Sequence, residues 1–122
     1  MSSAEEDNLK RFNVARRPLS DGGVELAVSG ELDLATAEGF EPLLMETIEA
    51  TERSVTVDFA NCSFVDSSGV RALIAAARAL EKSGRTLRIT GARAQVRDLF
   101  QMIVLDRAPA IEFIDDGDQP AP

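Results

Sequence analysis

The sequence predicts an α/β domain in two layers, in which a mixed four- to five-stranded sheet carries helices packed on one face. Three observations lead to this prediction. Segments with alternating apolar residues interchange with segments of helical spacing in the order β-β-α-β-α-β-α-β. A helix between two strands favours parallel strands joined by right-handed crossovers. Every predicted strand alternates apolar and polar residues, so the helices are expected to cover only one face.

The first two strands form a predicted antiparallel hairpin. Apolar residues alternate with polar ones at 12–14 and again at 24–28, and the intervening PLSDGG, residues 18–23, has the composition of a turn. The spacing then changes to a helical stripe over 40–48. Pro42 lies within this stripe, and a proline inside a helix loses a hydrogen bond. The helix is therefore expected to begin near Phe40 or to kink there.

The second half of the chain repeats strand and helix in turn. Its predicted strands lie at 55–59, 87–89 and 111–113, and its predicted helices at 70–80 and 96–103. Gly84 is expected to end the first of these helices as a C-cap. The predicted domain spans 9–115, between a flexible N-terminal segment, 1–8, and an acidic, proline-rich tail, 116–122, that is expected to be disordered.

The composition argues against most catalytic chemistry. Among 122 residues there is no histidine and a single cysteine, Cys62, so neither an imidazole base nor a thiolate zinc cluster is available. Neither common glycine-rich phosphate-binding motif occurs. We therefore expect no enzymatic activity, no catalytic residue, no metal and no cofactor. Cys62 is expected to be a small core residue.

Charge and hydropathy bear on partners and location. The net charge of −8 opposes binding to a phosphate backbone, and six phenylalanines without tryptophan or tyrosine make a poor base-stacking surface. The N-terminus lacks an apolar leader, and the apolar runs are too short to cross a bilayer. The protein is expected to be cytoplasmic, with neither a nucleic-acid partner nor membrane association.

A polar sequence, Asp66-Ser67-Ser68-Gly69, separates a predicted strand from the helix that follows it. One interpretation is structural, because Asp and Ser are preferred helix N-caps. The other is a phosphorylation site, because the free N–H groups at a helix start tolerate an anion on Ser67 or Ser68. Gly69 fits the structural interpretation less well. Glycine in a first turn costs up to about 1 kcal/mol relative to alanine, which suggests a close approach to the backbone there.

A second polar segment, SGELDLATA at 29–37, follows the second strand. Loops after strands of such a sheet gather at one carboxyl edge, so Asp33 is expected to face Asp66. Two carboxylates suggest acid/base chemistry or a divalent metal, but a third ligand is not evident. The alternative, which stays open, is that Asp33 is a turn or cap residue.

These two segments, SGELDLATA at 29–37 and VDFANCSFVDSSGVRALIAAARAL at 57–80, resemble the STAS domain of bacterial anti-sigma factor antagonists. The resemblance extends over about residues 10–115. It implies the STAS fold, a sheet with helices on one side, and Ser67 as phosphoacceptor. An unphosphorylated antagonist binds a serine-kinase anti-sigma factor and so frees a sigma factor. The kinase switches it off by phosphorylating the serine, and a PP2C-type phosphatase resets it.

The resemblance, with one further assignment from spacing, also implies which residues contact the partner. The expected partner-binding residues are Glu31, Asp33, Asp66, Ser68, Gly69 and Arg71. Arg71 is assigned from spacing, since it lies four residues after Ser67 on the same helical face, where it would meet an anionic partner or the phosphate. A solvated surface side chain is the alternative for Arg71.

Other functions stay open on the sequence alone. The chain could be a STAS docking subunit of a signalling scaffold or of a lipid-transport complex. An aspartyl-phosphate receiver using Asp58 or Asp66 is disfavoured, because neither of the two lysines is suitably placed. A hydrolase using Ser67 is disfavoured by the absence of histidine.

Overall fold

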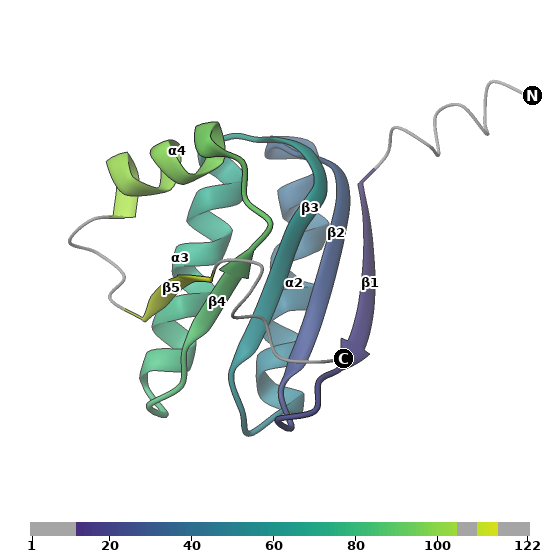
Figure 1. The fold of residues 1–122 in the computed structure, drawn as a ribbon, viewed down its shortest axis with the longest axis vertical. Helices are drawn as coiled ribbons and strands as arrows, with labels where there is room; N and C mark the ends of the chain where they lie inside the picture. Colours follow the sequence, from purple (N-terminus) through teal and green to yellow (C-terminus); the bar gives the residue numbers. More distant parts are fainter. Residues whose placement is uncertain (1–11, 105–109, 115–122) are drawn as a thin grey trace, which may run out of the picture.

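The computed structural model, in which residues 12–104 and 110–114 are described, contains one five-stranded sheet (Figure 1). The first two strands are antiparallel and the remaining neighbours are parallel, so the predicted mixed sheet and element order are confirmed. The predicted segments 1–8 and 116–122 lie outside the described residues. In spatial order, the strands are β1 (Asn13–Pro18), β2 (Val24–Leu32), β3 (Val55–Val65), β4 (Leu87–Thr90) and β5 (Ile111–Ile114).

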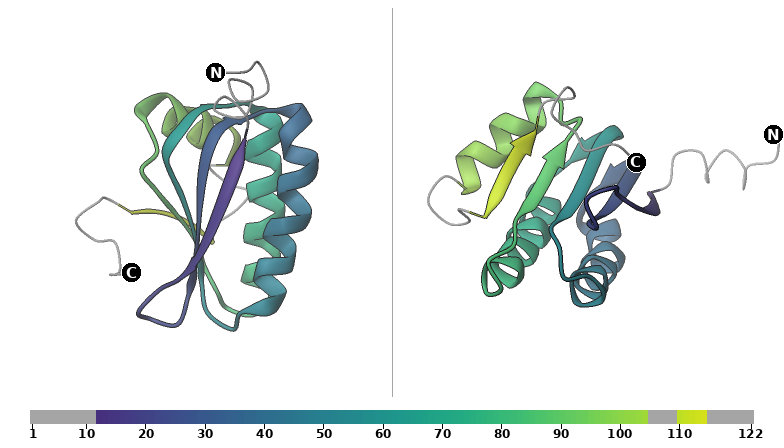
Figure 2. Two further views of the ribbon diagram at one scale, coloured as in Figure 1. Left: turned by 90° about the vertical axis from the view of Figure 1, so that its right-hand side faces the viewer. Right: turned by 60° about the horizontal axis from the view of Figure 1, so that its bottom comes forward.

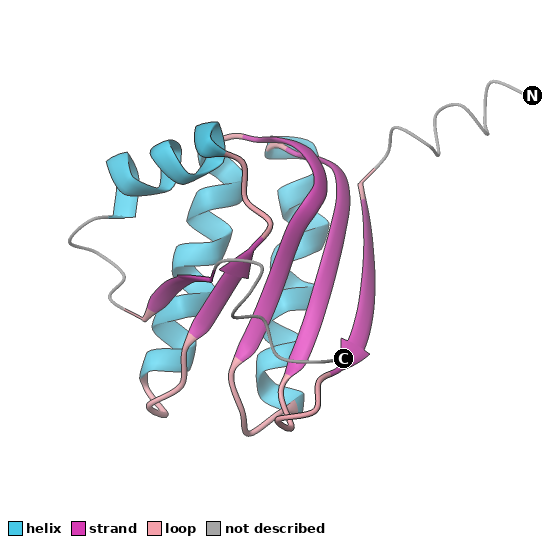
Figure 3. Cartoon of the chain, viewed as in Figure 1, coloured by secondary structure: helices cyan, strands magenta, loops and turns pink. Residues whose placement is uncertain are grey.

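In the described part of the chain, three helices accompany the sheet, α2 (Leu34–Ala50), α3 (Ser67–Glu81) and α4 (Ala94–Val104). Helices α2 and α3 lie side by side on one face, and α4 lies across the carboxyl end of the parallel strands (Figures 2 and 3). The ring of Phe100 on α4 reaches that same face, where its centroid is 6.5 Å from that of Phe59 and 5.4 Å from that of Phe113. The predicted two-layer arrangement is therefore confirmed.

The core lies between the sheet and helices α2 and α3. Alternate residues of β3, such as Val55 and Val57, are buried beside Leu87 and Ile89 of β4, with which they are in register. Helix α3 contributes its apolar stripe to the same cluster, including Leu73. Burial of this apolar surface is the main force that holds the two layers together. The alternation predicted from the sequence corresponds to this helix-covered face.

Helix α2 begins at Leu34, so the predicted start near Phe40 is wrong. The side chain of Asp33 accepts a hydrogen bond from Thr36 N at 3.0 Å, and Thr36 Oγ1 accepts one from Asp33 N at 2.8 Å. This capping box starts the helix. Pro42 lies inside the helix at an exposed position, where water can satisfy the carbonyl that loses its intrahelical partner.

The face of the sheet without helices carries a row of polar residues in register. Arg17 Nε lies 2.7 Å from Glu25 Oε1, and Glu25 is only 1% exposed. Glu25 is followed in register by Thr56 and then by Arg88. Since a buried charge is costly unless it is paired, Arg17 stabilises Glu25 on this face.

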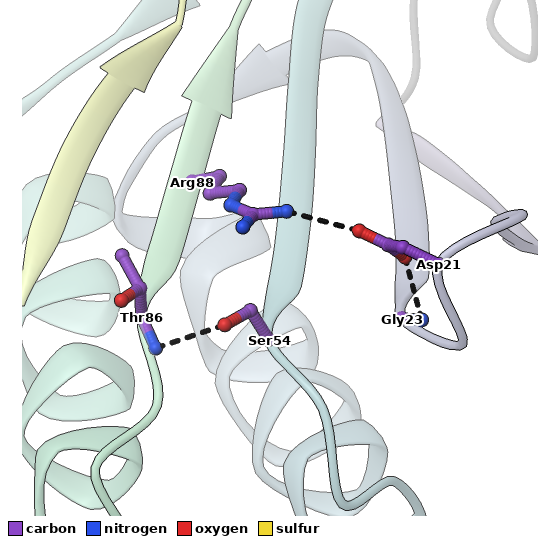
Figure 4. A network of polar contacts seen from close by, with 5 residues as sticks. All are labelled: Asp21, Gly23, Ser54, Thr86 and Arg88. Atoms are coloured by element: carbon purple, nitrogen blue, oxygen red, sulfur yellow. Dashed lines mark hydrogen bonds and ion pairs between the residues drawn. The ribbon is translucent and has the colours of Figure 1, made fainter. Parts of the chain in front are cut away.

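Arg88 links β4 to the turn between β1 and β2 (Figure 4). Its Nη1 lies 3.1 Å from Asp21 Oδ2, while Asp21 Oδ1 accepts a hydrogen bond from Gly23 N at 2.8 Å. Nearby, Thr86 N donates to Ser54 Oγ at 3.1 Å. These contacts lie at the amino end of the parallel strands, so the opposite end is free of this structural network.

Candidate functional site

The loops that follow β2 and β3 meet at the carboxyl edge of the sheet. Leu32 and Val65, the last residues of the two strands, are paired in register, and Asp66 N donates a hydrogen bond to Leu32 O at 3.1 Å. Asp33 and Asp66 each come directly after these paired residues. The structure therefore brings the two aspartates to the same edge, as the sequence predicts.

Both aspartates are helix N-caps. Asp66 Oδ1 accepts hydrogen bonds from Ser68 N at 2.9 Å and from Gly69 N at 3.2 Å, so it satisfies two of the free N–H groups of α3. Asp33 forms the capping box of α2, and the N–H of Thr36 is the main cause of its lowered pKa. The structural interpretation of these two carboxylates is confirmed. A metal site would need a third ligand beside the two carboxylates. The described residues contain no group of three or more His, Cys, Asp or Glu side chains that could hold a metal ion.

Ser67 is the first residue of α3, and it is exposed. Because Asp66 supplies the cap, the hydroxyl of Ser67 is not needed to satisfy the helix start. Within residues 12–104 and 110–114, no hydrogen bond involves Ser67 Oγ. Ser68 is half-buried in the same turn and offers less of its side chain to a partner. Ser67 is thus the more accessible of the two candidate hydroxyls.

Gly69 is buried beneath this turn. A Cβ at this position would lie 2.7 Å from Leu32 Cγ and 3.1 Å from Val65 Cγ1. The close approach predicted from the sequence exists, and it is made by core side chains at the ends of β2 and β3. Packing therefore explains this glycine, and its predicted contact with a partner stays a prediction.

Exposed apolar side chains that the sequence interpretation missed lie at the same carboxyl edge of the sheet as Ser67. Leu34, the first residue of α2, is 68% exposed, and Phe64, near the end of β3, is 48% exposed. Phe64 pairs in register with the exposed Glu31, and Arg71 is exposed one turn beyond Ser67 on α3. Their only signal in the sequence is an apolar residue within two positions of each cap and outside any helical stripe. We call Glu31, Leu34, Phe64, Ser67 and Arg71 the carboxyl-edge surface.

Cys62 does not belong to the carboxyl-edge surface. It is buried in the core, as predicted, and burial raises the pKa of its thiol. A thiol with a raised pKa is a poor nucleophile at neutral pH. In the described part of the chain, no helix is both long and apolar enough to span a membrane.

Comparison with known proteins agrees with this fold. Residues 15–114 match the family described as "Mlab, STAS domain". The anti-sigma-B factor antagonist of Staphylococcus epidermidis is 30% identical over 82 residues, which cover 67% of this chain and 76% of that protein. The anti-sigma factor antagonist SpoIIAA in its unphosphorylated form has a TM-score of 0.67 at 22% identity, covering 84% of this chain and 88% of its own. Bacillus SpoIIAA in the phosphorylated form has a TM-score of 0.65 at 22% identity, covering 86% of this chain and 94% of its own.

The chain therefore belongs to the STAS domain family, and within that family to the anti-sigma factor antagonists. Proteins of this group are regulators and not enzymes. Membership of the anti-sigma factor antagonists implies an anti-sigma factor as partner.

Proposed function

We propose that this protein binds a serine-kinase anti-sigma factor when Ser67 is unphosphorylated, thereby freeing a sigma factor in the cytoplasm, and that phosphorylation of Ser67 weakens the complex. The observation that carries the proposal is the position of Ser67. It is the exposed first residue of α3, and Asp66 performs the capping that a serine would otherwise supply. A kinase can therefore modify the hydroxyl without removing a hydrogen bond on which the helix depends.

The surroundings of Ser67 support a protein partner. Leu34 and Phe64 expose apolar side chains at the same edge. Removing such apolar surface from water on binding is favourable in proportion to the area buried. Glu31, Asp33 and Arg71 add charges around them, which favour one orientation of the partner over others. In this proposal Ser68 and Asp66 flank the phosphoacceptor.

Phosphorylation would change the surface and leave the fold intact. A phosphate on Ser67 adds a charge of about −1.5 to −2. At the start of α3 it meets the positive end of the helix dipole, which is favourable to the folded domain. For a docked partner the same charge must lose its water next to apolar Leu34 and Phe64, which is costly. A PP2C-type phosphatase would restore the binding form.

The proposal is tested with the full chain as bait in a lysate of the native host. The baits are wild type, Ser67→Ala, Ser67→Glu and, as a control, Ser20→Glu, which adds the same charge at the exposed turn between β1 and β2. We expect wild type, Ser67→Ala and Ser20→Glu to retain an ATPase-fold anti-sigma factor that Ser67→Glu loses. With that protein and ATP, mass spectrometry should find phosphate on Ser67. Thermal unfolding of Ser67→Glu should occur at the wild-type temperature or slightly above it, because the added charge lies at the positive end of the helix dipole.

Equal retention of one partner by all four baits would contradict the phosphorylation switch. Ser67 would then be only the first residue of a helix. The protein would instead be a STAS docking subunit of a signalling scaffold or of a lipid-transport complex, and the identity of the retained partner would distinguish these two. Recovery of an ABC-type ATPase would favour transport.

A further inference from the structure

A groove of about 620 Å³ runs between β1 and α2 and opens at the carboxyl edge of the sheet. It is lined by the start of β1 and the residue before it, by residues at the end of β2 and by the first half of α2. Its apolar wall is formed by residues from the β1 and α2 sides. These residues are Phe12, Val14, Ala35, Phe40 and Leu43.

The apolar wall is ordered but incompletely covered. The rings of Phe12 and Phe40 meet edge to face with centroids 5.4 Å apart, which fixes one side of the groove. Phe12, Val14 and Leu43 are only half-buried, so they keep apolar surface in contact with water. An apolar side chain inserted here would remove that surface from water, which is favourable in proportion to the area buried.

The end of the groove nearest Ser67 is acidic. Glu31 and Asp33 both line it. Asp33 is held in its ionised form by the hydrogen bonds of the α2 capping box. No lysine or arginine is among the groove-lining residues of the described chain. A cationic group on an occupant would therefore find complementary charge at this end and nowhere else along the groove.

Gly39 lies on the groove in the interior of α2, and the fold itself does not explain it. Its φ is not positive, and a Cβ built there would meet no atom within 4 Å. Glycine in a helix interior costs about 1 kcal/mol relative to alanine. A glycine that serves neither backbone conformation nor internal packing fits a position where another molecule approaches the helix closely.

We propose that this groove receives a segment of the protein that docks at Ser67, and that the segment inserts an apolar side chain beside Gly39 and places an adjacent lysine or arginine against Glu31. The inference rests on the proposed function for the identity of that protein as an anti-sigma factor. It rests on the structure for the chemistry of the segment. Glu31 belongs both to the groove and to the carboxyl-edge surface, so one partner can occupy the two without a gap.

The first test identifies which protein contacts the groove and which contacts the carboxyl-edge surface. A photoreactive p-benzoylphenylalanine replaces the exposed Asn13 at the rim of the groove, and in a second protein it replaces Phe64 on the carboxyl-edge surface. Each full-length protein is cross-linked in host lysate, and the joined peptides are sequenced. We expect both positions to react with one protein, and position 13 to react within a segment that has an apolar residue next to lysine or arginine.

The outcomes separate the groove from the proposed function. If position 64 reacts with an anti-sigma factor while position 13 reacts with nothing or with a second copy of this chain, the groove proposal is wrong and the function stands. If both positions react with a protein that is not an anti-sigma factor, and position 13 does so at a basic, apolar segment, the groove proposal is supported and the function fails. Absence of reaction at both positions overturns both.

The second test fills the groove and uses the purified partner found by cross-linking. Gly39→Gln adds bulk inside the groove and replaces glycine with a better helix former. The matched control, Ala50→Gln, adds a glutamine side chain at the exposed last residue of the same helix, away from the groove. We expect Gly39→Gln to bind about tenfold more weakly, as loss of one buried apolar contact predicts, and Ala50→Gln to bind as wild type.

Two further measurements guard this interpretation. Thermal unfolding of Gly39→Gln should occur at the wild-type temperature or above it, so weaker binding cannot come from a damaged fold. Glu31→Gln should weaken binding several-fold and reduce its dependence on salt, because it removes one charge of the proposed pair. Binding of Gly39→Gln with wild-type affinity would overturn the proposal.

Discussion

Gly69 and Gly39 both lie inside helices, but the space around them differs. A Cβ on Gly69 would lie 2.7 Å from Leu32 Cγ, inside the core, whereas a Cβ on Gly39 would have no atom within 4 Å. Both substitutions to alanine gain helix propensity, because glycine is the less favourable residue by about 1 kcal/mol. The balance between that gain and steric crowding decides the effect of each substitution.

We predict that Gly69→Ala destabilises the domain and that Gly39→Ala stabilises it. Overpacking a core typically costs about 1–3 kcal/mol, which exceeds the gain in helix propensity at Gly69. Gly39→Ala should raise the free energy of unfolding by about 0.5–1 kcal/mol, since nothing opposes the gain. Urea unfolding of the two variants beside wild type measures both. A shift of the same sign for the two would contradict this account.

Asp21 should contribute to the pH dependence of stability. The backbone N–H of Gly23 is the main cause of its lowered pKa, and Arg88 lowers it further. A carboxylate whose pKa is lower in the folded than in the unfolded chain stabilises the fold fully above the ordinary value of 3.8. This stabilisation is lost as the pH falls through the lower folded-state value.

The difference in stability between wild type and Asp21→Asn should therefore shrink as the solution is acidified below the ordinary aspartate pKa. Asparagine keeps an oxygen that can accept from Gly23 N but loses the ion pair with Arg88. Urea unfolding of both proteins over a pH series gives the difference directly. A difference that stays constant from neutral to acid pH would exclude the ionised carboxylate as its cause.

At the scale of the element, two different residues at the start of α3 cap the helix and present an exposed hydroxyl. Asp66 precedes the helix and accepts from two of its N–H groups, and Ser67 opens the helix with its hydroxyl exposed. The start of α2 has the same plan, with Asp33 as cap and the exposed Leu34 as first residue. The two strand-to-helix junctions are thus alike in structure, and they differ in presenting a hydroxyl at one and an apolar side chain at the other.

Asp66→Ala should lower the free energy of unfolding by about 0.5–2 kcal/mol, the usual effect of losing an N-cap. Asp66→Asn should keep most of the stability, because the amide oxygen can still accept from Ser68 N and Gly69 N. Chemical denaturation gives the free energy of unfolding of each variant, and the comparison separates the effect of the capping hydrogen bonds from that of the charge. If Asp66→Asn is as unstable as Asp66→Ala, the charge of Asp66 and not its hydrogen bonds would be what matters.

At the scale of the whole molecule, the strands of the sheet differ in the free energy needed to open them. Strand β3 is the longest, with 11 residues, and it lies between β2 and β4. Strands β1 and β5 lie at the edges, and β5 has only four residues. An edge strand has ladder hydrogen bonds on one side only, so it opens at lower free energy than the centre.

We predict that the backbone amides of β5 exchange with solvent deuterium at least about tenfold faster than those in the middle of β3. Amides of β1 should be intermediate, since this strand is longer but also at an edge. Hydrogen exchange followed by NMR at neutral pH resolves the individual strands. Equal protection of β3 and β5 would mean that the sheet opens only by unfolding of the entire domain.

The sequence predicted the element order and the covered face, because apolar periodicity reports directly on which side chains are buried. It predicted a strand only at 55–59, whereas β3 continues to Val65. The reason is a register shift, since Ala27 pairs with Asp58 but Ser29 pairs with Asn61. An irregularity of this kind breaks the period of two on which the prediction depends.

The candidate site was predicted in part. Asp33, Asp66 and Ser67 were recognised because polar residues at strand ends have a local signature. The capping role of Thr36 was missed, and with it the true start of α2, because Pro42 favoured a later start. Leu34 and Phe64 were missed for another reason. Exposure depends on which elements pack nearby, and an apolar letter in a sequence does not report it.

The strands lie in the sheet in the same order as they occur in the sequence, which is also the order in which they are synthesised. Strand β1 pairs with β2, β2 with β3, β3 with β4, and β4 with β5. Each strand therefore pairs with the strand that immediately precedes or follows it in the sequence. Domains whose contacts join segments close in the chain fold faster than those that rely on distant pairings. The nascent protein can therefore assemble its sheet progressively, one neighbour at a time, while the remainder is still being translated.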